Sequence, residues 1–106
     1  MGRVGARVER DGRTWWPMPA EARALSVDGV AFAVYLGVAD ATLGQRAVLC
    51  VESAGGELTP SARDALHRAL APWPIDEMRA FPRIPRDPRH EGKPDLARLI
   101  PMLEPA

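Results

Sequence analysis

Two apolar runs, separated by a short polar break, constrain most strongly what this chain can fold into. The first, VAFAVYLGV over residues 30–38, has large apolar side chains at every second position, with small residues and Tyr35 between them. The second covers residues 46–51 and ends at Glu52. Strands that are apolar on both sides are usually central in a sheet and covered on both faces. The sequence therefore predicts two such strands joined by a turn over residues 39–44.

A hairpin and a short helix are predicted before the first apolar run. Residues 6–10 alternate apolar and polar side chains, as a half-buried strand does, and residues 14–16 can form the returning strand. Asp11-Gly12 between them is a strong short hairpin signal. Prolines follow directly, and because proline is tolerated in a first helical turn, we expect a short helix over about residues 18–26.

A second helix, a third strand and a last helix are predicted after the second apolar run. Thr59 and Pro60 are typical of the N-cap and first position of a helix, which is expected over about residues 60–71. Its apolar stripe consists of Ala62, Leu66 and Leu70, with Ala65 and Ala69 beside it. A strand over residues 75–81 and a helix over residues 94–99 complete the order β-β-α-β-β-α-β-α. This order predicts an α+β fold, with a small three-stranded sheet flanked by helices and an N-terminal β-hairpin.

Composition and charge exclude several classes of function. The 106 residues correspond to one domain or to one detached piece of a larger one. The 14 basic and 14 acidic side chains balance, so no net field would steer the chain onto nucleic acid or an anionic membrane. A single cysteine, Cys50, excludes an internal disulfide and fits a reducing compartment. No apolar run approaches the ~20 residues of a membrane span, and the first residues do not resemble a signal peptide. We expect a soluble, cytoplasmic protein.

Lys93 stands out because the other thirteen basic side chains are all arginine. A solitary lysine raises the question of what an ammonium group does there that a guanidinium could not. On its own the observation is equally compatible with chance, and a solvated surface lysine before a helix is the plainer interpretation.

The segment that contains Lys93 resembles the end of the adenylate-forming ligases, a superfamily that includes acyl- and aryl-CoA synthetases, luciferases and adenylation domains. These enzymes end with an apolar strand, a proline-punctuated loop, Gly-Lys and a short helix; here the chain has a strand, IPRDPRHE, Gly92-Lys93 and PDLARL. Four segments earlier in the chain also resemble segments of that superfamily and occur in the same order. They are Gly2-Arg3-Val4 before a hinge, residues 10–17 with Glu21, Leu43-Gly44-Gln45-Arg46 before a strand, and residues 66–74.

The resemblance implies that the chain is the small C-terminal lid domain of such a ligase, with residues 1–5 as a hinge remnant, 6–17 as the hairpin and 18–106 as the body. Lys93 would then be the catalytic residue. The remaining implied site residues are Gly92, His90 and Arg89 in a substrate or nucleotide loop, Gly12, Arg13 and Trp15 in a second-face loop, and Arg3 and Gly5 at the hinge. ATP with Mg²⁺ would be bound mainly by a separate N-terminal adenylate-binding domain, none of it held by this chain alone.

A narrower resemblance concerns residues 2–8 and 85–90, which are similar to segments of bacterial enzymes of olefinic hydrocarbon synthesis. Those enzymes activate a β-hydroxy acid with ATP and close it to a β-lactone, so a fatty or β-hydroxy acid is the implied substrate. Two features depart from the superfamily. Gly5 stands where an Asp or Lys hinge is common, and nothing in the chain resembles a phosphate-cradling glycine-rich loop. This chain alone is therefore not expected to adenylate anything.

Plainer interpretations compete with several of these assignments. His90 is more often a surface residue of a polar loop, His67 a solvated one, Glu21 a helix-surface charge and Cys50 a core thiol. Trp15 and Trp16 cannot both face one core, so one of them is left for an interface or for capping the sheet edge. Residues 83–89 carry three arginines, but acids and prolines flank them, which favours a solvated loop over a nucleic-acid contact. A stand-alone, non-catalytic α+β binding module therefore remains the alternative to a ligase lid.

Overall fold

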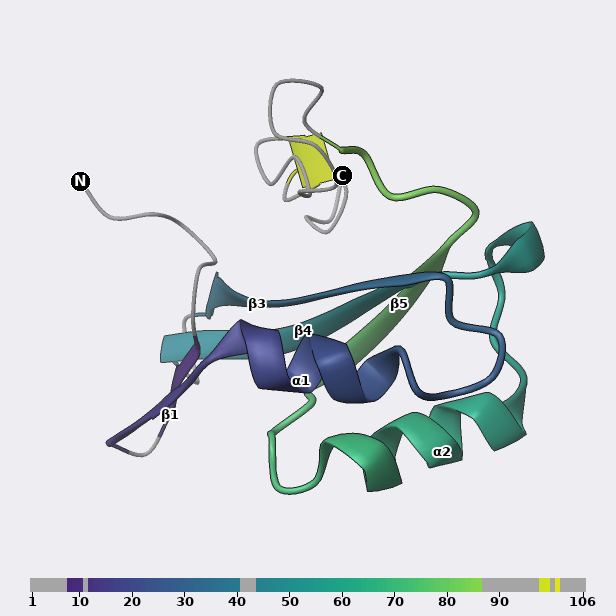
Figure 1. Cartoon of the computed structure of the whole chain (residues 1–106). Coiled ribbons are helices and arrows are strands. Elements are labelled where there is room, and N and C mark those ends of the chain that lie inside the picture. The colour runs from purple at the N-terminus through teal and green to yellow at the C-terminus, as the bar shows by residue number, and fades with distance from the viewer. Residues whose placement is uncertain (1–7, 11, 41–43, 87–97, 100, 102–106) are drawn as a thin grey trace.

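The computed structural model describes residues 8–10, 12–40, 44–86, 98–99 and 101 (Figure 1). The elements in chain order are β1 (Val8–Arg10), β2 (Arg13–Trp15), α1 (Pro17–Ala24), β3 (Phe32–Asp40), β4 (Gly44–Glu52), the 3-10 turn η1 (Ala54–Gly56), α2 (Pro60–Leu70) and β5 (Glu77–Phe81). Arg98, Leu99 and Pro101 are also helical, and the rest of the predicted last helix lies outside the described residues. The predicted α+β class, with a three-stranded sheet, flanking helices and an N-terminal hairpin, is confirmed.

The three-stranded sheet has the order β3-β4-β5, with β3 antiparallel and β5 parallel to β4. The expectation that both apolar runs form central strands is wrong for β3, because β4 is the centre and β3 is an edge of the described sheet. Apolar side chains on both faces of a strand indicate that both faces are covered, but they do not indicate whether the strand lies at the centre or at the edge of the sheet. The turn predicted over residues 39–44 is also shorter, since β3 continues to Asp40 and β4 begins at Gly44.

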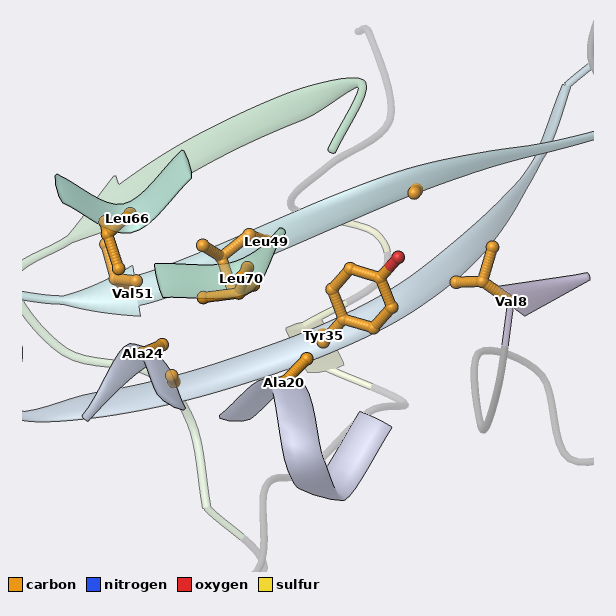
Figure 2. Close-up of a cluster of buried hydrophobic side chains, with 10 residues drawn as sticks. Val8, Ala20, Ala24, Tyr35, Leu49, Val51, Leu66 and Leu70 are labelled. Atoms are coloured by element: carbon orange, nitrogen blue, oxygen red, sulfur yellow. The ribbon is translucent and has the colours of Figure 1, made fainter. Parts of the chain in front are cut away.

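One face of the sheet packs against both helices, and Figure 1 shows α1 and α2 on that side. The buried residues of this first core are Val8, Ala20, Ala24, Ala33, Tyr35, Ala47, Leu49, Val51, Leu66 and Leu70. In Figure 2, Leu66 and Leu70 lie beside Val51 and Leu49 of β4. Ala20 and Ala24 lie four residues apart and so share one face of α1, where their small side chains let the helix approach the sheet closely.

The opposite face of the sheet forms a second core with residues that follow β5. Its buried members are Val34, Leu36, Val38, Val48, Cys50, Phe81, Ile84 and Leu99. Figure 1 shows the segment after β5 crossing to this side, away from α1 and α2. Ile84 and Leu99 are both fully buried, so the chain on either side of residues 87–97 is held in the same core.

The predicted helix N-cap at Thr59 and the predicted hairpin turn at Gly12 are both present in the structure. Thr59 is the N-cap of α2, and its side-chain oxygen accepts a hydrogen bond of 3.1 Å from the Ala62 amide, while Leu66 and Leu70 are its buried residues. In the hairpin, Arg10 pairs with Arg13, and Gly12 has φ of 76°, a conformation that glycine adopts at little cost. In the described part of the chain, no helix is long and apolar enough to cross a membrane.

Candidate functional site

The structure describes three of the predicted site residues, all of them in the hairpin: Gly12, Arg13 and Trp15. The residues assigned to catalysis, to the substrate loop and to the hinge lie outside the described residues. These are Lys93, Gly92, His90, Arg89, Arg3 and Gly5. The geometry of the candidate site is therefore built from the second-face loop and from the described residues that lead toward Lys93.

Two indole rings and two guanidinium groups form a continuous surface beside the hairpin, which we call the tryptophan cluster: Arg13, Trp15, Arg23 and Trp73. The guanidinium carbon of Arg13 lies 4.3 Å from the ring centre of Trp15, and that of Arg23 lies 4.9 Å from the ring centre of Trp73. The two indoles meet edge to face, with their centres 5.7 Å apart and their planes at 60°. Such edge-to-face and cation–π contacts each contribute about 0.5–1.5 kcal/mol.

Backbone carbonyls hold the tryptophan cluster in place. The Trp73 indole N–H donates to the Trp16 carbonyl at 3.1 Å, and Arg23 donates to the Ala71 carbonyl at 3.0 Å. Neither Trp73 nor Arg23 is among the site residues expected from the sequence. The run Pro72-Trp73-Pro74 is a local sign that a helix ends, and nothing in it indicates proximity to the hairpin.

The two adjacent tryptophans divide between packing and exposure, because neighbouring side chains of an extended backbone point to opposite sides. Trp15 is half-buried and packs against the first core, whereas Trp16 is 57% exposed. Trp16 is also the last residue before α1, where Met18 is 78% exposed. The hairpin end of the molecule therefore presents aromatic, thioether and guanidinium groups together at the surface.

A second cluster lies where the chain leaves β5 toward Lys93. We call it the Glu52 anchor; it consists of Phe32, Glu52, Ile84 and Arg86. One carboxylate oxygen of Glu52 accepts the Ile84 amide at 2.9 Å and pairs with the Arg86 guanidinium at 3.1 Å. The Arg86 guanidinium also lies 4.1 Å from the ring centre of Phe32. The pKa of the Glu52 carboxyl is lowered, chiefly by the hydrogen bond from Ile84. Burial acts in the opposite direction, and the hydrogen bond and charge of Arg86 lower the pKa further.

The Glu52 anchor corrects the expectation that the arginines after β5 lie in a solvated loop. Arg83 is exposed, as expected, but the Arg86 side chain is only 31% exposed and is engaged by Glu52 and Phe32. The same contacts count against a nucleic-acid surface here, because the charge of Arg86 is already balanced by a carboxylate. Arg89 lies outside the described residues.

Glu21 is a second correction, because it is half-buried and not a helix-surface charge. Its carboxylate accepts a hydrogen bond of 2.8 Å from the backbone amide of Tyr35, on the edge strand β3. Burial raises the pKa of the Glu21 carboxyl, and the Tyr35 hydrogen bond opposes that rise. The side chain therefore joins α1 to β3, which is a structural task. Tyr35 itself donates its hydroxyl to the Pro74 carbonyl at 2.7 Å.

The two other titratable residues that the sequence singled out behave as predicted. Cys50 is fully buried in the second core, where burial raises the pKa of its thiol to about 12. His67 lies exposed on α2. Among the described residues, no group of three or more His, Cys, Asp or Glu side chains could hold a metal ion.

An open hollow of about 360 Å³ lies between η1, the start of α2 and β5. Its lining consists of Gly56, Glu57, Leu58, Arg63, Met78, Arg79 and Ala80. None of the site residues predicted from the sequence and described in the structure lies in this lining. The hollow is thus separate from both the tryptophan cluster and the Glu52 anchor.

Solved structures with this fold are numerous, although the sequence matches no protein-family model and no curated protein. The fatty acyl CoA synthetase of Mycobacterium tuberculosis has a TM-score of 0.74 at 21% identity, covering 92% of this chain and 20% of that one. For the acyl-CoA synthetase of Brucella canis the TM-score is 0.73 at 23% identity, with coverage of 93% and 19%. A mutant of the amide bond synthetase McbA from Marinactinospora thermotolerans has a TM-score of 0.77 at 19% identity, with coverage of 99% and 22%.

These neighbours are adenylate-forming enzymes of the acyl-CoA synthetase type, and the chain spans 19% to 22% of their length. At such identities the likeness establishes the fold and nothing finer. The match nevertheless covers 92% to 99% of this chain. The chain has the α+β fold of the C-terminal domain of adenylate-forming enzymes.

Proposed function

We propose that this chain is the lid domain of an ATP-dependent, adenylate-forming acyl ligase and supplies Lys93 for the activation of a carboxylic acid to acyl-AMP. One observation carries the proposal: more than nine-tenths of this chain superposes on about a fifth of each synthetase. A unit that matches a small part of larger enzymes so completely is expected to work with a counterpart of their remaining part. That part would be an N-terminal adenylate-binding domain, on the same or a separate chain.

The chemistry of the proposed reaction explains the type of residue at position 93. When a carboxylate attacks the α-phosphate of ATP, negative charge accumulates around the phosphorus atom in the transition state. A compact ammonium group on a four-carbon stem can reach such a centre and stabilise it electrostatically. Gly92 before it would allow the backbone to approach closely. Delivery by a separate domain makes activation depend on closure, as lids do in other enzymes.

Within the proposal, ATP and Mg²⁺ are assigned mainly to the N-terminal domain. On this chain, Lys93 and the adjoining Gly92, His90 and Arg89 would face the nucleotide and the acid. The hairpin residues Gly12, Arg13 and Trp15 would serve the second half-reaction. This division gives the tryptophan cluster a role distinct from that of Lys93, and Arg3 and Gly5 would form the hinge.

The proposed substrate is a fatty or β-hydroxy acid, and the proposed product of the second step is a β-lactone. The support is the similarity of residues 2–8 and 85–90 to enzymes of olefin biosynthesis. In such a reaction the substrate's own hydroxyl attacks the acyl adenylate, so no thiol carrier is needed. Product analysis with a β-hydroxy fatty acid, with and without coenzyme A, separates a lactone from a thioester.

Reconstitution tests the catalytic assignment. The chain is combined with the adenylating domain encoded upstream or in the neighbouring reading frame, and acid-dependent exchange of pyrophosphate into ATP is measured. We expect Lys93→Ala to lower exchange by about a hundredfold or more, the magnitude typical for the loss of one group that stabilises transition-state charge. Arg68→Ala, which removes an exposed cation on α2, is the matched control. Exchange at the parental rate in Lys93→Ala would show that the catalytic assignment is wrong.

A stand-alone binding module without catalysis is the second candidate, and the tryptophan cluster favours it. Exposed aromatic and guanidinium groups on one surface are typical of a binding face. This alternative predicts that no adenylating domain is encoded beside the chain and that Lys93 can be replaced without consequence. The neighbouring reading frame therefore distinguishes the two candidates most directly.

A further inference from the structure

The chain takes a defined path across the end of the sheet after β5. Phe32, Glu52 and Phe81 are abreast in the register of β3, β4 and β5, so they form one row across the sheet. Leaving β5 at Phe81, the chain places the Ile84 amide on Glu52 of β4 and then the Arg86 guanidinium over Phe32 of β3. Residues 81–86 therefore cross all three strands, from the β5 edge to the β3 edge.

Close contacts fix the beginning of this crossing. The Phe81 carbonyl accepts the Ser53 amide at 3.0 Å, which ties the end of β5 to the end of β4. Gly56 of η1 has φ of 73°, and a Cβ atom at that position would lie 2.7 Å from Cδ of Pro82. Only a glycine therefore lets η1 approach Pro82 this closely. The first two residues of the crossing are therefore fixed, Phe81 by Ser53 and Pro82 by Gly56.

The Glu52 anchor holds the crossing in the middle and at its end. Three contacts restrain the segment in different directions. The Ile84 side chain is buried, the Glu52 carboxylate binds both the Ile84 amide and the Arg86 guanidinium, and that guanidinium stacks on the Phe32 ring. The Arg86 guanidinium also donates to the Ile84 carbonyl at 3.3 Å, which adds a restraint within the segment. The side chains of Glu52 and Arg86 are 17% and 31% exposed, so water screens their interaction only in part.

We propose that Glu52 is a positioning residue: by holding Ile84 and Arg86 across the sheet, its carboxylate sets the direction in which the chain departs toward Lys93, seven residues after Arg86. The inference deepens the proposed function and rests on it. The rate of carboxylate attack on the α-phosphate is sensitive to small displacements of the ammonium group that stabilises the transition state. A displacement of about 1 Å can lower the rate about a hundredfold. Glu52 itself would touch neither substrate nor nucleotide.

The variants that test the proposal separate the two bonds of the Glu52 carboxylate. Glu52→Gln keeps an oxygen that can accept the Ile84 amide but loses the ion pair with Arg86. Glu52→Ala removes both bonds. Glu77→Gln is the matched control, because Glu77 also forms ion pairs on this face of the sheet, but with Arg46 and Arg79. Circular dichroism establishes that each variant is folded; should Glu52→Ala unfold, Glu52→Gln and Arg86→Gln carry the test.

The first measurement uses the chain alone. Nitroxide labels are attached to Lys93→Cys and to Arg68→Cys on the exposed side of α2, while the buried Cys50 stays unlabelled. The distribution of label-to-label distances is then measured by pulsed electron resonance. We expect a broader distribution in Glu52→Gln than in the parent, a still broader one in Glu52→Ala, and the parental one in Glu77→Gln.

The second measurement uses the chain reconstituted with its adenylating domain and with Lys93 intact. For Glu52→Ala we expect kcat of pyrophosphate exchange to fall about ten- to a hundredfold, with KM for ATP and acid within roughly twofold of the parent, because the loss concerns the transition state. Glu52→Gln should fall between Glu52→Ala and the parent, and Glu77→Gln should match the parent. A merely structural role would also lower the apparent kcat at unchanged KM, but only through the folded fraction. We therefore express kcat per folded chain, as measured by circular dichroism; a merely structural role then gives the parental kcat.

The outcomes distinguish failure of the anchor from failure of the proposed function. If Lys93→Ala lowers exchange as expected but the Glu52 variants keep the parental kcat or the parental distance distribution, the positioning role is overturned and the lid function stands. If Lys93→Ala leaves exchange intact, the proposed function itself is wrong, and no effect of Glu52 variants on kcat can be ascribed to the placement of Lys93.

Discussion

Glu21 and Cys50 show how burial alters individual ionisable side chains in this small fold. Each has a raised pKa, and for both the main cause is burial, which disfavours the charged form. Glu21 retains a partner, the Tyr35 amide, whereas the Cys50 thiol lies among the apolar residues of the second core. At the scale of the residue, burial disfavours the ionised form of Glu21 while its hydrogen bond joins α1 to β3, and burial makes the Cys50 thiol unreactive.

Glu21 is predicted to respond in opposite ways to two substitutions. Its folded-state pKa lies above the ordinary 4.5, so the ionised carboxylate opposes folding once the pH exceeds the folded value. Glu21→Gln keeps an acceptor for the Tyr35 amide without the charge, and we expect its unfolding free energy at pH 7 to equal or exceed that of the parent. Glu21→Ala removes this acceptor from a buried amide and should cost about 1–3 kcal/mol.

Urea unfolding at pH 7 measures both values. A glutamine variant as unstable as the alanine variant would contradict the structural assignment of Glu21. Because both variants lack the negative charge, that result would indicate that the charge itself, and not the acceptor, is what the fold needs there.

Cys50 is predicted to resist thiol reagents while the chain is folded. With a pKa of about 12, only about one thiol in ten thousand is ionised at pH 8, and the thiolate is the reactive form. Labelling with a chromogenic disulfide should be slow in buffer and complete within minutes in urea. Rapid stoichiometric labelling of the folded chain would mean that the second core opens readily.

At the scale of elements, the sequence signals at the helix ends correspond to specific hydrogen bonds. Thr59 caps α2, and Pro60 follows at the first helical position, where a missing amide proton costs nothing. The helix then buries Leu66 and Leu70 against β4. Asp76, just before β5, exchanges two hydrogen bonds with Ala47, of 2.7 and 2.8 Å, which set where the parallel strand begins.

Removing the cap of α2 should lower stability by a modest and specific amount. We expect Thr59→Ala to reduce the unfolding free energy by about 1 kcal/mol, the usual value of a threonine N-cap. Ser61→Ala is the control, because Ser61 lies exposed in the same first turn, and its loss should stay within about 0.5 kcal/mol. Equal losses in the two variants, measured by thermal or urea unfolding, would exclude a capping role for Thr59.

At the scale of the whole molecule, acidic groups on the second face of the sheet connect stability to pH. The pKa of Glu52 is lowered, chiefly by the Ile84 hydrogen bond. For Glu77, burial is the largest single effect and raises the pKa, but the combined hydrogen bonds and charges of Arg79 and Arg46 outweigh it and lower the pKa. Both carboxyls therefore stabilise the fold when they are ionised.

The stability of the chain is accordingly predicted to fall in acid. Because the folded-state pKa values lie below the ordinary 4.5, the contributions of Glu52 and Glu77 are complete above that pH and are lost as the pH drops through the folded values. Urea unfolding between pH 7 and pH 3 should show this decline. In Glu52→Gln the decline should be shallower, and an unchanged slope would contradict the lowered pKa of Glu52.

The fold could be predicted from the sequence because most of its signals are local. The hairpin turn at Gly12, the cap at Thr59 and the alternation of residues 30–38 act within a few residues of the chain, and each is found where expected. Element ends differ by a few residues, because hydrogen bonding between strands continues β3 past its apolar run to Asp40 and starts β4 before its run, at Gly44, whereas β3 begins only at Phe32. Whether Lys93 takes part in catalysis stays a prediction.

Contacts between distant segments could not be read from local pattern. Trp73 joins Trp15 across 58 positions, and Arg86 reaches Phe32 across 54, because the α2–β5 connection and the crossing after β5 return the chain to its earlier strands. The sequence by itself determined the order of the elements and their apolar positions, and it placed Cys50 within an apolar run. Only the tertiary structure decided that β3 lies at an edge of the described sheet, that Glu21 joins α1 to β3 and that Glu52 binds Ile84 and Arg86. The physical reason is that propensity and periodicity act along the chain, whereas burial, ion pairing and stacking depend on what the folded chain brings beside each residue.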